Sequence, residues 1–207
     1  LITHMFLHGD FGHILGNMFA LWMFGSVLEN VWGPKRFLLF YILCGVGASV
    51  LHLLILSYEF VPMASDLMQL SQMSVSGSSD FNQAVLAYSK AHNIQLTRIL
   101  SENNVSLATP GIRTEIMELL TNNYNKTLNT ATLGASGAVF GIIMAFVYLF
   151  PNTLIYIYFF FPIKAKWLGI LYFSYELFFA VRNTAGDNVA RWAHVGGAIV
   201  GFVLVYL

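Results

Sequence analysis

Long apolar stretches, separated by short polar connections, dominate the pattern of this sequence. Five of them are long enough, or nearly so, to cross a bilayer as helices, which takes about 20 residues each. They cover about residues 11–31, 37–58, 136–150, 168–181 and 189–207. The apolar run 156–161, between the third and fourth, is predicted to lie at the membrane interface or to extend a neighbouring span. The pattern predicts an all-α integral membrane protein.

A polar segment at about 59–132, rich in Ser, Asn, Gln and Thr, separates the second and third stretches. The piece 80–88 begins with Asp80 as a possible cap. Residues 110–120 carry apolar side chains three and four positions apart, so both pieces are predicted to be helical. No catalytic motif falls in this segment. It is predicted to be a partly helical insertion outside the membrane, which leaves membrane helices in 1–58 and 133–207.

Composition agrees with a lipid environment. Of 207 residues, 57% are hydrophobic and only 10% are charged, whereas about a quarter are charged in soluble domains. The formal net charge is 0 and no basic run occurs, so electrostatics gives no case for nucleic acid as a partner. The single cysteine, Cys44, excludes a disulfide or a cysteine-based metal site within the chain.

Basic residues predict the orientation. Lys35 and Arg36 lie between the first and second spans, and Lys164 and Lys166 lie between the third and fourth. The positive-inside rule makes both loops cytoplasmic, so the insertion and the 182–191 loop lie outside. The first, third and fifth spans then all begin on the outer side.

This common direction brings polar side chains from distant parts of the chain to one depth. Polar groups at membrane depth are costly unless they are paired, so their convergence predicts a site near the outer face. The residues concerned are His4, His8, His13, Asn17, Ser136 and His194.

Ser136 stands in the glycine-rich sequence Gly134-Ala-Ser-Gly-Ala-Val-Phe-Gly141, at the start of the third span. Free backbone N–H groups and the helix dipole favour developing negative charge at such a position. A serine hydroxyl is a weak nucleophile that needs a neighbouring base. The alternative is a helix-capping serine in a packing turn.

His194 is the candidate base. Two GxxxG pairs, Gly137 with Gly141 and Gly197 with Gly201, predict that the third and fifth spans pack closely. That contact would bring His194 within reach of the serine. The alternative is an interfacial histidine bonded to a backbone carbonyl.

His13 and Asn17 lie four residues apart, on one face of the first span. Their N–H groups could hold the oxyanion of a tetrahedral intermediate. The alternative is a pair of side chains that only joins two helices. His4, His8 and His13 also invite a zinc site, but no HExxH sequence accompanies them, and no metal is predicted. The paired Gly-x-Gly-Asp sequences of a membrane aspartyl protease are absent as well.

Together these residues resemble the rhomboid intramembrane serine proteases. The resemblance covers almost the whole chain apart from the insertion, and its order and helix direction make short motifs specific in combination. The motifs are His4-Met-Phe-Leu-His8, His13-xxx-Asn17, Glu29 with Gly33, Gly134-Ala-Ser136-Gly137 and Ala193-His194-xx-Gly197-xxx-Gly201.

The resemblance implies a dyad of Ser136 and His194 with no acidic third member; Asp187, the acid nearest to His194 in sequence, is given no role. It implies an oxyanion hole from His13 and Asn17 together with backbone N–H groups at the serine. Phe140 is expected to pack against the catalytic histidine. Supporting roles are expected for His8, as a structural hydrogen-bonding residue, and for Gly134, Gly137 and Gly197.

The implied activity is endoproteolysis of transmembrane segments of other membrane proteins, near their outer ends and after a small residue, without a cofactor. The implied partners are substrate helices and the lipid bilayer, and the oligomeric state is not predicted. The resemblance favours the bacterial type, in a bacterial cytoplasmic membrane.

Two departures accompany the resemblance. The family core has six spans, five appear here, and the sixth is expected before Leu1; the insertion ahead of Ser136 is also atypical. Activity of the fragment alone is therefore left open. Two alternatives remain: an inactive rhomboid-like protein that binds transmembrane helices, and a transporter or channel, which would need polar residues along a path through the bilayer.

Overall fold

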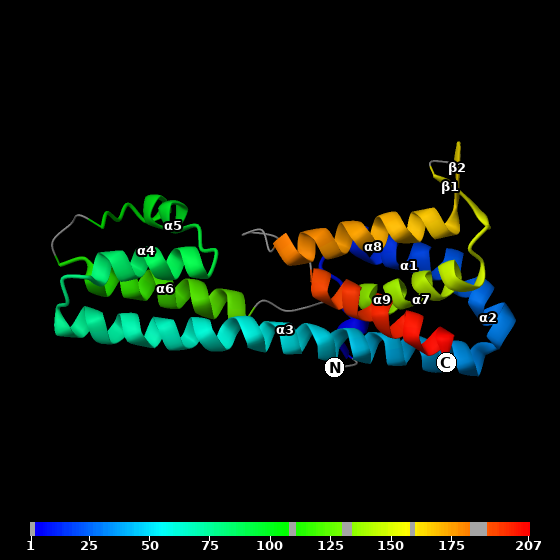
Figure 1. The fold of residues 1–207 in the computed structure, drawn as a ribbon, viewed down its shortest axis with the longest axis horizontal. Coiled ribbons are helices and arrows are strands. Elements are labelled where there is room, and N and C mark those ends of the chain that lie inside the picture. The colour runs from blue at the N-terminus through cyan, green and yellow to red at the C-terminus, as the bar shows by residue number, and fades with distance from the viewer. Residues whose placement is uncertain (1–2, 108–110, 130–133, 158–159, 183–189) are drawn as a thin grey trace. The chain divides into compact units, whose positions relative to one another are not determined.

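The computed structural model describes residues 3–107, 111–129, 134–157, 160–182 and 190–207. These divide into two compact units. The first, here called the bundle, takes in the described residues up to 55 and from 134 onward. The second, the insertion, takes in the described residues of 56–129. Figure 1 labels the elements of both units.

The first span of the bundle is one continuous helix, Phe11–Trp32. It consists of α1 (Phe11–Ala20), a π-helical turn (Leu21–Gly25) and α2 (Ser26–Trp32), and a 3₁₀ turn (Thr3–Phe6) precedes it. Asp10 caps α1, since its Oδ1 accepts the backbone N–H of His13 at 2.8 Å. Gly33 ends α2 at φ +79°, a conformation that favours glycine. The predicted range of 11–31 therefore agrees with the structure to within one residue.

The second span belongs to a much longer helix, α3, which runs over 43 residues from Pro34 to Ser76. The predicted second span, about 37–58, lies within this helix, which continues beyond it, and the predicted boundary of the insertion falls inside the helix. The change to polar composition alters what surrounds a helix but does not break its backbone. The break comes at Gly77, whose φ is +72°. At 1.5 Å per residue α3 is about 64 Å long, twice the hydrocarbon core of a bilayer.

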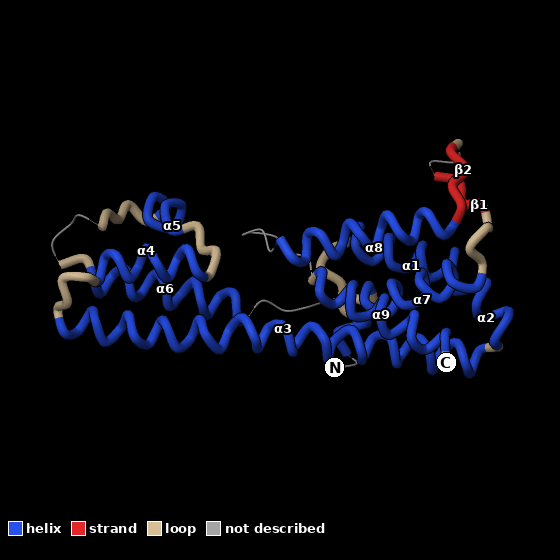
Figure 2. Tube along the Cα trace, in the orientation of Figure 1, coloured by secondary structure: helices blue, strands red, loops and turns tan. Residues whose placement is uncertain are grey.

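The last three apolar stretches form α7 (Ser136–Leu149), α8 (Ala165–Arg182) and α9 (Arg191–Tyr206). Between α7 and α8, β1 (Leu154–Ile157) pairs antiparallel with β2 (Phe161–Lys164) (Figure 2), so the described part of the run 156–161 does not extend a neighbouring helix, and its position at the membrane interface stays a prediction. Pro151 follows the end of α7 and disfavours its continuation, and aromatic and β-branched residues suit the strands that follow.

Length and hydropathy together select two helices of the described chain as long enough to cross a membrane, Phe11–Trp32 and α3. The helices α7 and α9 are apolar but shorter. The predicted number of five spans is therefore not established by these criteria.

Large apolar side chains cover much of the outside of the bundle. They include Trp22, Leu54, Leu171, Phe178 and Phe202, all exposed. A water-soluble protein rarely leaves so much apolar surface bare, whereas lipid tails solvate it. The bundle has the surface of a helical membrane protein.

Glycine contacts join α7 to α9. A Cβ built on Gly197 would overlap the carbonyl oxygen of Gly137, and one built on Gly201 would lie 2.5 Å from the Cα of Gly141. The two backbones therefore touch without side chains between them, as the GxxxG pairs predict. This contact fixes the relative position of the first turns of α7 and α9.

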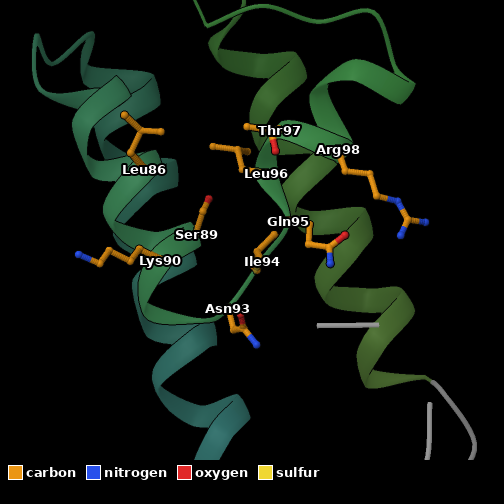
Figure 3. Close-up of a pocket in the computed structure, with 9 residues that line it drawn as sticks. All are labelled: Leu86, Ser89, Lys90, Asn93, Ile94, Gln95, Leu96, Thr97 and Arg98. Carbon is orange, nitrogen blue, oxygen red and sulfur yellow. The ribbon is translucent and has the colours of Figure 1, made fainter. Parts of the chain in front are cut away.

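The insertion packs the second half of α3 with α4 (Phe81–Ala91), α5 (Leu96–Glu102) and α6 (Arg113–Leu128). Phe81, Val85, Ile116 and Leu120 are fully buried in its core. Both predicted helical pieces are present as α4 and α6, although Pro110 lies outside the described residues. Asp80 occupies the cap position of α4, but its side chain makes no capping hydrogen bond. Figure 3 shows a pocket between α4 and α5 whose lining, from Leu86 to Arg98, includes none of the predicted site residues.

Candidate active site

The structure brings Ser136 and His194 together, although they are 58 residues apart in the sequence. Ser136 is the first residue of α7, and His194 lies in the first turn of α9. The Oγ of Ser136 lies 2.8 Å from the Nε2 of His194, within hydrogen-bond distance. The arrangement is that of a hydroxyl beside a base that can accept its proton.

Aromatic rings hold the imidazole of His194. The Phe140 ring is stacked on it, with centroids 4.4 Å apart and planes 10° from parallel. Tyr172 of α8 packs on Phe140, with centroids 4.8 Å apart. Phe140 is one turn after Ser136, so the same helix places both the hydroxyl and the ring that restricts the imidazole.

The ring of His194 has a second partner that the sequence did not assign. Its Nδ1 lies 3.0 Å from the Oε2 of Glu176, on α8. Arg191 donates to the same oxygen through Nη1 at 3.3 Å. The side chains of Glu176 and Arg191 are only 5% and 13% exposed. The resemblance implied a dyad with no acidic third member, whereas in this structure an acidic side chain lies beside His194.

A signal for Glu176 was present in the sequence. It is the single acidic residue of the predicted fourth span, and an ionisable residue inside a span is costly unless it has a partner. The fourth span is predicted to run opposite to the first, third and fifth, so its C-terminal part reaches the face where Ser136 and His194 lie. The acid nearest to His194 along the chain is Asp187, which lies outside the described residues.

Asn17 lies beside the backbone that leads into Ser136. It is buried, and its Nδ2 has no hydrogen-bond partner among the described residues. A Cβ built on Gly134 would lie 3.6 Å from that nitrogen and 2.6 Å from the Nε2 of His13. Gly134 has φ +121°, so only glycine suits this position. Two side-chain nitrogens thus flank the segment just before the serine, and one of them is a buried donor with its hydrogen-bonding capacity unused.

His4 performs the structural role that the sequence assigned to His8. The Nε2 of His4 lies 3.0 Å from the Oγ of Ser49, and its carbonyl oxygen accepts the N–H of Gly134 at 3.0 Å. The Nε2 of His8 is buried without a hydrogen-bond partner among the described residues, and its ring meets His13 edge to face at 5.2 Å. The expected hydrogen bond of His8 is therefore not seen at this atom.

The chain is similar in sequence to known proteins of one family. The chain matches the Rhomboid domain over residues 1–106 and 99–207. It is 28% identical to the RHOMBOID-like protein 12, mitochondrial, of Arabidopsis thaliana, over 98% of this chain and 44% of that protein. It is 26% identical to an uncharacterized mitochondrial rhomboid protein of Schizosaccharomyces pombe, over 98% of this chain and 48% of that protein.

A third relative is bacterial. The rhomboid protease GluP of Bacillus subtilis is 35% identical over 31% of this chain and 12% of that protein. The chain spans about half the length of the mitochondrial relatives. Because those relatives carry mitochondrial names, the prediction of a bacterial type in a bacterial cytoplasmic membrane gains no support. No solved structure is significantly similar to the chain.

Proposed function

Because the chain belongs to the rhomboid family, we propose that it is a serine endopeptidase that cleaves transmembrane segments, with Ser136 as nucleophile and His194 as general base. The observation that carries the proposal is the 2.8 Å contact between the Oγ of Ser136 and the Nε2 of His194. Polar side chains are costly inside an apolar bundle, and the proposed chemistry explains why these two are present and in contact.

The first chemical step follows from that contact. His194 takes the proton of Ser136 while Oγ attacks the carbonyl carbon of the scissile peptide bond. The tetrahedral intermediate carries a negative oxygen, for which the unused Nδ2 donor of Asn17 and the ring of His13 are the nearby side-chain candidates. The first N–H groups of α7, which begins at Ser136, have no partner within the helix and are proposed as further donors.

Collapse of the intermediate breaks the C–N bond, and His194 returns its proton to the departing amine. Water then attacks the acyl-enzyme with His194 again as base, which releases the new carboxylate and restores Ser136. Every step uses groups that the chain itself contains.

The substrates proposed are transmembrane helices of other membrane proteins, cut near their outer ends after a small residue. The serine lies at an end of α7, so the scissile bond must reach the site near one membrane face. A substrate helix has to unwind locally there, since a helical peptide bond is shielded by its own backbone. The insertion is proposed to lie outside the bilayer.

The test uses the full-length protein in proteoliposomes with a model transmembrane substrate. We expect cleavage by the wild type and by Ser174→Ala, a matched serine of α8, and none by Ser136→Ala. A fluorophosphonate should label the wild type and fail to label His194→Ala. Equal cleavage by Ser136→Ala would overturn the assignment of the nucleophile. Capture of the substrate without cleavage or labelling would instead favour a rhomboid-like protein that only binds transmembrane helices.

A further inference from the structure

The imidazole of His194 bridges two helices through its two nitrogens. Nε2 faces Ser136 of α7 at 2.8 Å, and Nδ1 faces the Oε2 of Glu176 of α8 at 3.0 Å. An imidazole ring carries its nitrogens on different edges, so a partner on each side fixes the plane of the ring as well as its position. Serine, histidine and a carboxylate thus stand in the order of a catalytic triad.

The carboxylate determines which nitrogen carries the proton. An ionised carboxylate only accepts hydrogen bonds, and a neutral imidazole has one N–H. A bond to Glu176 therefore requires the hydrogen on Nδ1, which leaves the lone pair of Nε2 free to accept the proton of Ser136. Without this partner, the tautomer with hydrogen on Nε2 would point a donor at the serine and could not act as its base.

We infer that Glu176 is a positioning residue, an inference that rests on the proposed proteolysis. Glu176 holds His194 in the reactive tautomer and stabilises the imidazolium that forms when Ser136 attacks. The proton of Ser136 moves to Nε2, the Nδ1 proton stays in its bond to Glu176, and the carboxylate gains and loses nothing. The positive ring then lies 3.0 Å from a buried negative charge. In a site with little water, such an interaction is much stronger than in solution.

Arg191 makes this buried carboxylate tolerable. Its Nη1 lies 3.3 Å from the same Oε2, and its guanidinium lies over the rings of Phe179 and Tyr175, at 5.0 and 5.5 Å from their centroids. The aromatic faces and the carboxylate share the guanidinium charge. Opposite charges within the bundle thereby offset each other while His194 is neutral.

A purely structural ion pair is the competing explanation, and it makes a different prediction. If Glu176 served only as the partner of Arg191, removing either side of the pair would have similar consequences. If Glu176 positions His194, its loss must affect the chemical step far more than the loss of Arg191. Both side chains are buried to a similar degree, so the two variants are well matched.

The first experiment compares Glu176→Gln with Arg191→Gln in the full-length protein. Glutamine keeps the shape of the side chain and removes its charge. We expect kcat for the model substrate to fall by roughly 100-fold or more in Glu176→Gln, with KM unchanged and the rate of fluorophosphonate labelling reduced in parallel. Arg191→Gln should lose much less kcat, and Glu176→Asp should recover part of the loss. Equal kcat in Glu176→Gln and wild type, or equal losses in the two glutamine variants, would overturn the inference.

The second measurement needs no change at Glu176, so it decides the matter even if the variants do not fold. The ¹⁵N spectrum of histidine-labelled wild type, with His194→Gln to assign the resonance, reports which ring nitrogen is protonated. Hydrogen on Nδ1 supports the inference, and hydrogen on Nε2 of the neutral ring contradicts it. The proposed function is tested separately by Ser136→Ala: if the wild type cleaves and Ser136→Ala does not, failure of Glu176→Gln to act as expected counts against the triad alone.

Discussion

The bundle and the insertion are both helical, but they are held together in different ways. In the bundle, α7 meets α9 backbone to backbone through glycines, and the buried carboxylate of Glu176 has a charged partner in Arg191. In the insertion, large apolar side chains such as Phe81 and Ile116 fill the space between helices. A glycine contact admits no added atom, whereas a side-chain core can rearrange. The difference suggests that the bundle is built for a fixed geometry and the insertion for stability.

The largest effect is expected from the glycine contact. In Gly197→Ala the new methyl group would overlap the carbonyl oxygen of Gly137, and backbone atoms on both sides cannot move away separately. We expect the α7–α9 contact to open and fluorophosphonate labelling of Ser136 to be lost. Gly16→Ala is the control, because nothing lies within 4 Å of its added carbon. Normal labelling of Gly197→Ala would show that the contact is not rigid.

A core substitution in the insertion should act on that unit alone. Phe81 is 0% exposed, so Phe81→Ala should cost about 3–5 kcal/mol of the free energy of unfolding of the insertion. Hydrogen exchange in α4 and α6 measures this cost, with the exposed Leu86→Ala as control. Labelling of Ser136 should persist, because the bundle has its own core. If labelling disappears at the same denaturant concentration as protection in α4, the two regions unfold as one cooperative unit.

The unused amide of Asn17 should matter for rate more than for stability. Asn17→Ala removes a donor that has no partner among the described residues, so the melting temperature should stay the same or rise slightly. The value of kcat should fall by roughly 10²–10³-fold if the amide holds the oxyanion. Ser49→Ala provides the contrast, since its hydroxyl is bonded to His4 and to the carbonyl of Gly45, and its loss should cost about 1 kcal/mol of stability. A marked loss of stability in Asn17→Ala would argue for a structural role.

The smallest effect concerns Tyr88, a buried tyrosine of the insertion. Burial, followed by the charges of Asp66 and Tyr124, raises the pKa of Tyr88 to about 12. Because the unfolded tyrosine ionises near pH 10 and the folded one does not, stability should fall between pH 10 and 12, by at most about 1.4 kcal/mol per pH unit. The variant Tyr88→Phe should lack this pH-dependent loss of stability, whereas Tyr58→Phe, which changes an exposed tyrosine, should retain it. Identical pH profiles of wild type and Tyr88→Phe would contradict the assignment.

Hydropathy predicted the apolar helices well, because the need to bury or solvate apolar side chains acts on each segment directly. It did not predict that α3 continues beyond the apolar stretch, since a helix ends at a backbone signal such as Gly77 and not where its surroundings change. The strands β1 and β2 were missed because a short aromatic run has no decisive period.

The candidate site was predictable where a residue has a local signature, as with Ser136 beside its glycines. Glu176 has no motif around it: its charge inside an apolar span marks it, but its contact with His194 depends on the packing of α8 against α9, which no segment encodes alone. The hydrogen bond between His4 and Ser49 has the same origin. Both histidines belong to one short motif, and only the packing of α3 decides which of them meets Ser49.

The order of the chain gives the Ser136–His194 contact a consequence during biosynthesis. A ribosome makes the serine 58 residues before the histidine, and the carboxylate of Glu176 also precedes His194 by 18 residues. Until α9 is made, the nascent chain holds a hydroxyl without a base, and such a hydroxyl is a poor nucleophile. Under the proposed function the growing chain is latent until then, and synthesis of α9 works as the switch that removal of a propeptide provides in proteases.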